Sequence, residues 1–150
     1  MGNFILKLRL RFLSRERFEP VHLSGRELKA RVLSVYDGDT VTVGYRVNGG
    51  FWKSSLRIYG IDAPEMKPIR RDRSILSLER EKAAALASRN FLSDLILNRV
   101  VDLKLHDKSR DKYGRLLGAI FYRGENISEK MVESGHAIRY YGKAKLEFDS

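Results

Sequence analysis

Three consecutive segments of the chain carry apolar and polar residues in a strand-like pattern. Residues 30–36 are apolar and β-branched, residues 40–45 alternate with a period of two, and residues 51–59 resume the alternation. The turn sequences Asp37-Gly38-Asp39 and Asn48-Gly49-Gly50 separate them. This pattern predicts a three-stranded antiparallel meander.

The hydrophobic period changes after the third segment. Pro64 and Pro68 interrupt the strand pattern. Residues 78–97 then carry apolar side chains at a spacing near 3.6, which predicts a helix with one mostly apolar face. Ser77 is the expected start of this helix, because a serine side chain can accept a hydrogen bond from the first turn.

The remainder of the chain predicts further strands and one short helix. The strands are expected at 100–105, 116–122 and 138–141, and a charged loop covers 107–114. A helix capped by Asn126 or Ser128 should end near Gly135. Five main strands with a helix between the third and fourth match the order of an OB-fold barrel. The predicted fold class is α+β, mainly β: a five-stranded OB-fold barrel with a second, short helix after strand 5.

The N-terminal segment differs in composition from the predicted barrel. Residues 1–31 carry eight basic and three acidic residues, a net charge of +5. Basic residues interrupt the apolar run that a secretory signal needs. We therefore expect a basic arm over residues 1–28, either flexible or lying on an anionic membrane surface, before a domain over 29–150. The expected location is intracellular, with membrane association through the arm as an alternative.

Composition narrows the classes of function. The 150 residues are enough for about one domain, and 29 basic minus 19 acidic residues give a net charge of +10. The chain has no cysteine, which excludes a disulfide scaffold, a thiolate zinc site and a cysteine nucleophile. The basic balance favours a polyanionic partner, with nucleic acid first among them.

Within this basic chain, residues 32–66 carry a net charge of −1. Asp39 and Asp62 lie at the ends of predicted strands that a meander can bring together. Two carboxylates and a main-chain carbonyl suit a hard divalent cation, so calcium, magnesium or manganese could bind here. Glu65 follows Asp62 by three residues and could orient or deprotonate a water molecule at such a cation.

Two arginines complete the candidate chemistry. Arg57 and Arg115 are forked donors that match phosphate oxygens, and they would stabilise the charge that a phosphodiester gains when water attacks it. Together with the carboxylates they predict metal-assisted phosphodiester hydrolysis. Two alternatives remain: Arg115 could end a loop by pairing with Asp111, and Asp37 could support Asp39 or only cap the turn.

Three motifs, Asp37-Gly38-Asp39-Thr40, Leu56 to Glu65 and Asp111-Lys112-Tyr113-Gly114-Arg115, resemble the staphylococcal nuclease (thermonuclease) family in order and spacing. The resemblance covers residues 29–141. It implies that calcium is held by Asp39, Asp62 and the main-chain carbonyl of Ala63. It also implies that Glu65 is the general base or water-orienting group, and that Arg57 and Arg115 bind phosphate.

The resemblance further implies a nucleotide site. Lys112 and Tyr113 match positions near the terminal phosphate of a bound nucleotide, and Tyr140 or Tyr141, of which we favour Tyr141, matches an aromatic residue near the base or sugar. The family cleaves DNA and RNA with little sequence preference and leaves 3′-phosphate ends. The expected cofactor is calcium, the expected partners are DNA and RNA, and the expected state is a monomer.

Two other functions compete with a nuclease. The first is a nucleic-acid-binding module whose catalytic site has lapsed, and the second is an adaptor that docks a membrane or a protein through residues 1–28. All five charged site residues are present, which favours the enzyme. Outside the site, we expect Trp52 in the core or on its rim, and we expect a structural role for His136.

Overall fold

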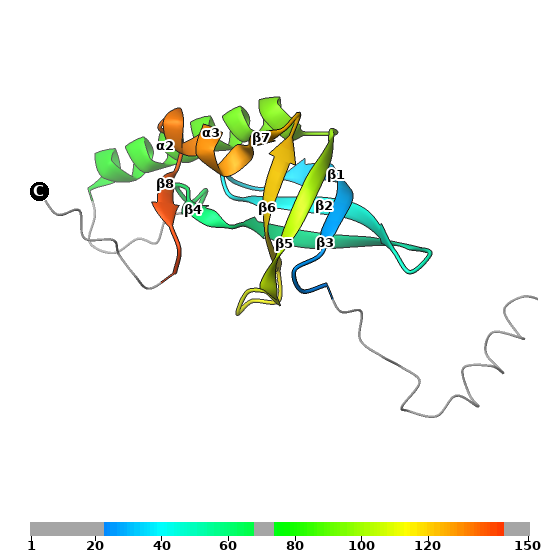
Figure 1. The fold of residues 1–150 in the computed structure, drawn as a ribbon. Helices are drawn as coiled ribbons and strands as arrows, with labels where there is room; N and C mark the ends of the chain where they lie inside the picture. Colours follow the sequence, from blue (N-terminus) through cyan, green and yellow to red (C-terminus); the bar gives the residue numbers. More distant parts are fainter. Residues whose placement is uncertain (1–22, 68–73, 143–150) are drawn as a thin grey trace, which may run out of the picture.

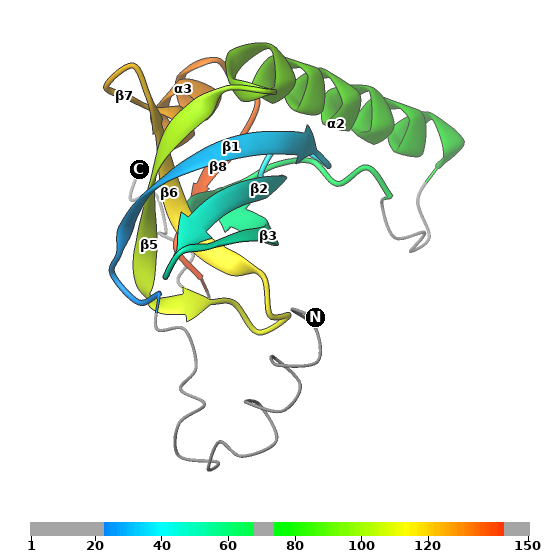
Figure 2. The same cartoon turned by 90° about the vertical axis from the view of Figure 1, so that its right-hand side faces the viewer.

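Six strands form one sheet that curls back on itself in the computed structural model, which describes residues 23–67 and 74–142. The strands are β1 (Glu27–Val35), β2 (Thr40–Val47), β3 (Gly50–Ile58), β5 (Val100–Arg110), β6 (Leu116–Tyr122) and β7 (Glu125–Asn126). Their order is β3-β2-β1-β5-β6-β7, and a parallel pairing of β3 with β6 closes the barrel (Figures 1 and 2). The predicted OB-fold barrel is confirmed.

Two helices and a small second sheet complete the fold. The helix α2 (Ile75–Ile96) links the meander to β5, and α3 (Ile127–Glu133) follows β7. The short strands β4 (Gly60–Asp62) and β8 (Ile138–Tyr140) pair in antiparallel fashion. Both helices lie at the same end of the barrel, beside this small sheet (Figure 1).

The helix termini show which capping predictions hold. The helix α2 begins after Ser74, whose side chain accepts a hydrogen bond from the Ser77 N–H at 3.2 Å, so the predicted start at Ser77 is wrong by one turn. At α3 the predicted cap is confirmed, because the Asn126 side chain accepts from the Ser128 N–H at 2.9 Å. The two caps work in the same way, through a side-chain oxygen that satisfies a free N–H of the first turn.

Three other predictions need correction. The strand β5 continues to Arg110, so the loop expected at 107–114 is shorter. The two-residue and three-residue strands β7 and β4 were not expected, because they are too short to show a period. Trp52 is 51% exposed and is not a core residue, because β3 is buried only at Leu56 and Ile58, near its other end.

The barrel interior is filled by alternate residues of the strands. The fully buried apolar side chains of the strands include Val32, Val41, Leu56, Ile58, Leu103, Leu116 and Ile120. Leu92 and Ile96 from α2 join this core, as do Ile127 and Met131 from α3. Burial of one such side chain contributes roughly 1.5–3 kcal/mol, so packing fixes both helices on the barrel.

Some predicted features lie outside the described residues. These are residues 1–22 of the basic arm and residues 68–73 and 143–150 of the predicted domain. Among the helices of the described ranges, none has the length and apolar character needed to cross a membrane.

Candidate active site

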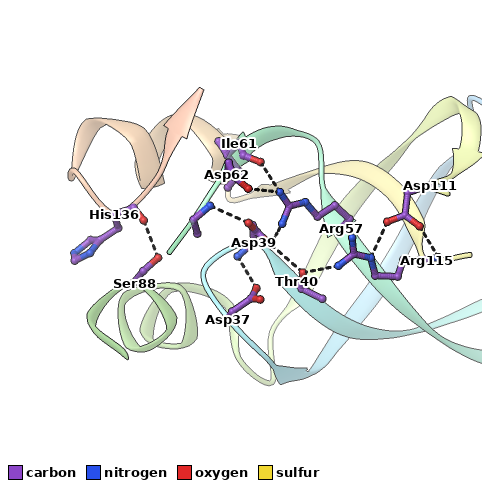
Figure 3. Close-up of polar contacts among 11 residues, drawn as sticks. Asp37, Asp39, Thr40, Arg57, Ile61, Asp62, Ser88, Asp111, Arg115 and His136 are labelled. Carbon is purple, nitrogen blue, oxygen red and sulfur yellow. Dashed lines mark hydrogen bonds and ion pairs between the residues drawn. The ribbon is translucent and has the colours of Figure 1, made fainter. Parts of the chain in front are cut away.

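The carboxylate of Asp39, directly before β2, is buried and held by its neighbours. Its own main-chain N–H donates to the Asp37 carboxylate at 3.1 Å, so the Asp37 side chain closes the turn. The Thr40 hydroxyl donates to Asp39 Oδ1 at 2.9 Å, and the Ala63 N–H donates to Oδ2 at 2.9 Å. Asp39 is 1% exposed, and these bonds fix its orientation (Figure 3).

Gly38 lets α2 pack directly against this turn. A Cβ at Gly38 would lie 1.9 Å from Ser88 Oγ and 2.7 Å from the Ala63 Cβ. Ser88 is fully buried in α2 and donates to the His136 carbonyl at 2.7 Å, which ties the helix to the loop before β8. The His136 ring stacks on Phe91 at 4.5 Å, so this histidine packs between elements. Sequence reasoning missed Ser88, although its spacing places it on the buried face of α2 with Leu92.

Arg57 on β3 joins the two aspartates. Its Nη1 forms an ion pair with Asp39 Oδ1, and its Nη2 contacts Asp62 Oδ1 at 2.7 Å. The same Nη2 donates to the Ile61 carbonyl at 3.3 Å. Adjacent nitrogens of one guanidinium therefore hold carboxylates from β4 and from the turn before β2, and the three predicted residues meet at one point (Figure 3).

Burial and charge act in opposite directions on this cluster. Burial raises the pKa of Asp39 above its ordinary value, and the Arg57 guanidinium only partly offsets that rise. Burial also disfavours the charged form of Arg57, but attraction to Asp39 and contact with Asp62 outweigh it, so the pKa of Arg57 lies above its ordinary value. The Arg57 guanidinium therefore stays in its charged form within the cluster.

Arg115 makes the pair with Asp111 that the sequence left open, and it also contacts Thr40. Its Nε pairs with Asp111 Oδ2 at 2.7 Å within the β5–β6 loop, and its Nη1 donates to the Thr40 hydroxyl at 3.3 Å. Asp111 Oδ1 accepts from the N–H groups of Tyr113 and Arg115 at 2.9 and 3.0 Å, which shapes the loop. Because Thr40 also bonds Asp39, the second arginine connects to the first through two side chains.

Lys112 and Tyr113 lie at the tip of the same loop. The Tyr113 ring is 71% exposed. The Lys112 ammonium lies 4.9 Å from its centroid, and the Arg115 guanidinium lies 5.5 Å from it. This arrangement gives a flat aromatic face flanked by two cations, which suits a phosphate next to a base or sugar.

Tyr141 lies next to the small sheet. Its ring packs edge-on against Tyr59 at 5.6 Å and covers Gly60, where a Cβ would lie 3.1 Å from a Tyr141 ring atom. Tyr140 is the register partner of Gly60 in the β4–β8 pair. Among the described residues, no hydrogen bond, ion pair or ring contact joins Tyr141 to the arginine cluster.

Glu65 is exposed, in the segment that follows Asp62. Within the described part of the chain its carboxylate makes no hydrogen bond or ion pair. It lines an open hollow of about 480 Å³ with Asp62, Ala63 and the loop around His136. The structure thus places Glu65 and Asp62 on the wall of the same hollow.

The donor set can be tested against the cation that the resemblance implies. Asp39 and Asp62 converge on one positive group, the guanidinium of Arg57, and both offer oxygen donors. Residues 23–67 and 74–142 contain no cluster of three or more histidine, aspartate or glutamate side chains able to hold a metal. Besides the two carboxylates, the Ala63 main chain lies close by, since its N–H donates to Asp39 Oδ2. This set fits a hard cation that keeps several waters.

Comparison with known proteins gives independent results. The sequence profile of the family described as Staphylococcal nuclease homologue matches residues 55–149. An uncharacterized endonuclease of Haemophilus influenzae is 31% identical over 110 residues, which are 73% of this chain and 51% of that protein. A probable endonuclease LCL3 of Yarrowia lipolytica is 32% identical over 83% of this chain and 61% of that protein. A probable staphylococcal-like nuclease CAN3 of Oryza sativa subsp. japonica is 31% identical over 73% of this chain and 22% of that protein.

Fold and site together define an OB-fold barrel with paired carboxylates and arginines at one end. With the matches above, this chain belongs to the staphylococcal nuclease family, as its motifs predicted. The profile match includes Arg57, Asp62, Glu65 and Arg115 and begins after Asp39. The chain spans between half and three-fifths of the length of the first two relatives.

Proposed function

We propose that this chain is a calcium-dependent nuclease that hydrolyses phosphodiester bonds of DNA and RNA with little sequence preference. The bridge Asp39–Arg57–Asp62 carries the proposal, because it gathers cation-binding and phosphate-binding groups at one point. The names of three relatives, two endonucleases and a staphylococcal-like nuclease, support it.

The arginines bind the scissile phosphate in this proposal. Arg57 and Arg115 approach the same region from β3 and from the β5–β6 loop, because both connect to Asp39, one directly and one through Thr40. Fork-shaped donors held in fixed positions stabilise the charge that develops on the phosphate oxygens.

Glu65 is the general base in this proposal. It takes a proton from a water molecule that attacks phosphorus in line. The bond from phosphorus to the 5′ oxygen breaks and that oxygen takes up a proton from solvent, so the products are a 3′-phosphate end and a 5′-hydroxyl end. Asp39, Asp62 and the Ala63 carbonyl would hold the calcium ion, which would supply Lewis acidity toward water and toward the charge of the phosphate. Lys112 and Tyr113 bind the nucleotide's terminal phosphate, and Tyr141 lies near its base or sugar.

The test is cleavage of single-stranded DNA by the purified full chain, in calcium and then in excess chelator. We expect cleavage only with calcium, and Glu65→Gln should lower turnover by about 10²- to 10⁴-fold. Glu79→Gln is the matched control, because Glu79 is an exposed glutamate on α2 outside the site.

Two results would contradict the proposal. Near-normal cleavage by Glu65→Gln would remove Glu65 from the mechanism. Binding that weakens with salt, without cleavage in calcium, magnesium or manganese, would instead identify a nucleic-acid-binding module.

A further inference from the structure

The outer face of the β2–β3 hairpin runs from the arginine cluster to the tip of the hairpin. In the register of the two strands, Thr40 faces Arg57 and, six pairs further on, Arg46 faces Phe51. Directly opposed residues of antiparallel strands point to the same side. The residues of this side between the cluster and the tip are Thr42, Gly44 and Arg46 on β2 with Phe51, Lys53 and Ser55 on β3, and we call them the hairpin face.

The hairpin face extends well beyond the site. Phe51 and Arg57 are six positions apart along an extended strand, a span of about 20 Å. The opposite side of the hairpin differs, since Val41, Val43 and Leu56 there are buried in the core. In Figure 1 the hairpin projects away from the small sheet and the helices, so its tip is the part farthest from β4 and β8.

Charge on the hairpin face has one sign. From residue 40 to residue 61 the chain contains no aspartate or glutamate, against the three basic residues Arg46, Lys53 and Arg57. Arg46 and Lys53 are exposed, and no carboxylate pairs with either of them among the described residues. By contrast, Lys29 and Lys104 on neighbouring strands are both paired with carboxylates. The unpaired cations of the hairpin are therefore available to an anion.

An aromatic ring stands at the end of this cationic face. Phe51 is 85% exposed, the most exposed large apolar side chain in the described residues, and the Arg46 guanidinium lies 5.8 Å from its centroid. On the opposite side of the hairpin, Trp52 stabilises the tip, because its indole N–H donates to the Val47 carbonyl at 3.3 Å. The ring of Phe51 is thus presented on an ordered hairpin.

We propose that the hairpin face binds the single-stranded continuation of the substrate, with Arg46 and Lys53 on backbone phosphates and Phe51 stacked on an unpaired base. This inference rests on the proposed function, because Arg57 fixes the scissile phosphate at one end of the face. Base stacking on an aromatic ring together with cations along the backbone is how proteins bind single strands without sequence preference.

A membrane is the other surface that an exposed ring and cations could meet. Insertion into a bilayer interface needs several apolar side chains together. Here Phe51 is the one apolar residue of the hairpin face, and the rest of the face is polar, small or cationic. The observations therefore favour a polynucleotide.

The test measures affinity as a function of oligomer length. Labelled oligothymidylates of two and about twelve nucleotides are titrated by fluorescence anisotropy in calcium, with the Glu65→Gln background keeping them intact. We expect Phe51→Ala to weaken binding of the long oligomer about tenfold and to leave the short one unchanged. Phe51→Trp should keep the affinity, because it keeps a stacking ring, and Phe51→Leu should lose it.

Salt dependence tests the cations separately. Arg46→Gln and Lys53→Gln should each reduce the slope of log affinity against log salt by about 0.7 for the long oligomer. Arg123→Gln is the matched control, since Arg123 is exposed and lies 5.2 Å from the Tyr122 ring, in the turn between β6 and β7. The control should leave affinity and slope unchanged.

The outcomes separate this inference from the proposed function. If Glu65→Gln and the double variant Glu65→Gln with Phe51→Ala bind the long oligomer with equal affinity, the proposed role of the hairpin face is wrong. This conclusion does not depend on the cleavage assay. Loss of binding to anionic vesicles by Phe51→Ala, with oligomer affinity unchanged, would also overturn it and assign the tip to a membrane. Failure of the wild-type chain to cleave in calcium would overturn the proposed function and is read from a separate assay.

Discussion

Two aspartate–arginine pairs face each other across the candidate site, and they differ in almost every physical respect. Asp39 and Arg57 come from separate parts of the meander, and their side chains are 2% and 18% exposed. Asp111 and Arg115 lie four residues apart in one loop, with 14% and 29% of their side chains exposed. The pKa of Asp39 is raised by burial, whereas that of Asp111 is lowered, because its hydrogen bonds outweigh the effect of burial.

The difference in burial indicates that the two pairs have different roles in the site. A buried pair is expensive to desolvate, and each partner depends on the other to remain charged. A partly exposed pair within a loop adds little stability and leaves its arginine free to exchange partners. We therefore expect Arg57 to hold the site together and Arg115 mainly to bind substrate.

Removal of Arg57 should have the largest effect. Arg57→Ala leaves the buried Asp39 carboxylate without its counter-charge, so the free energy of unfolding should fall by about 3 kcal/mol or more. Denaturation with urea in the presence of chelator measures this loss. The double variant Asp39→Asn with Arg57→Ala should recover part of it, because no buried charge remains. If Arg57→Ala were as stable as the wild type, the Asp39–Arg57 pair would not contribute to the free energy of unfolding.

Removal of Arg115 should separate activity from stability. We expect Arg115→Ala to reduce DNA cleavage about a hundredfold, since a positioned donor to the phosphate is lost. The free energy of unfolding should change by less than about 1 kcal/mol. Turnover and urea denaturation of the same variant are measured in parallel. Together they show whether Arg115 binds substrate or stabilises the fold. A loss of stability as large as that of Arg57→Ala would erase the distinction between the pairs.

Two glycines extend the same comparison to the backbone. Gly38, beside the buried pair, has no room for a Cβ, and Gly38→Ala should cost about 2 kcal/mol through overpacking against Ser88. Gly114, in the exposed loop, has open space but a φ of +81°, so Gly114→Ala should cost about 1 kcal/mol of backbone strain. Thermal unfolding of Gly38→Ala and Gly114→Ala measures both losses of stability. Each variant is also measured with Ser88→Gly added, which removes the side chain that a Cβ at Gly38 would meet. Relief by Ser88→Gly is expected only for Gly38.

The smallest effect is a pH dependence at Asp111. Its pKa in the folded protein is below the ordinary value of 3.8, so its contribution to stability is present above that value and is lost as pH falls through the lowered pKa. Wild type should therefore exceed Asp111→Asn in stability at about pH 6 and match it at about pH 2. Urea denaturation at both values gives the comparison. An advantage of wild type that persisted in acid would assign the effect to packing.

Much of the fold follows from local periodicity, and the exceptions have physical reasons. The five main strands and both helices each carry enough residues to show a period. The helix start shifted because Ser74 and Ser77 are both good caps, and only the folded chain shows which one bonds the first turn. Of the two positions expected for Trp52, the core and its rim, the core is wrong, because the hairpin extends beyond the core at that point.

The sequence motifs predicted which residues form the candidate site. They did not predict the contacts that form only when the barrel closes. Spacing identified the pair Asp39 and Asp62 and the partner Arg57, but the bridging role of that arginine required the strands to be placed. The role of Ser88 was not visible, because a serine on a helix face carries no chemical signature until Gly38 is packed against it.

The parallel pairing of β3 with β6 also has a consequence for the order of folding. It sets Arg57 beside Leu117, and 117 minus 57 gives a separation of 60 residues along the chain. Contacts between residues so distant form late, because the long intervening loop must first be closed. The two arginines therefore come together only as the barrel shuts. A partly folded chain lacks the two arginines at one point, so the nuclease activity proposed above would appear only in the completely folded chain.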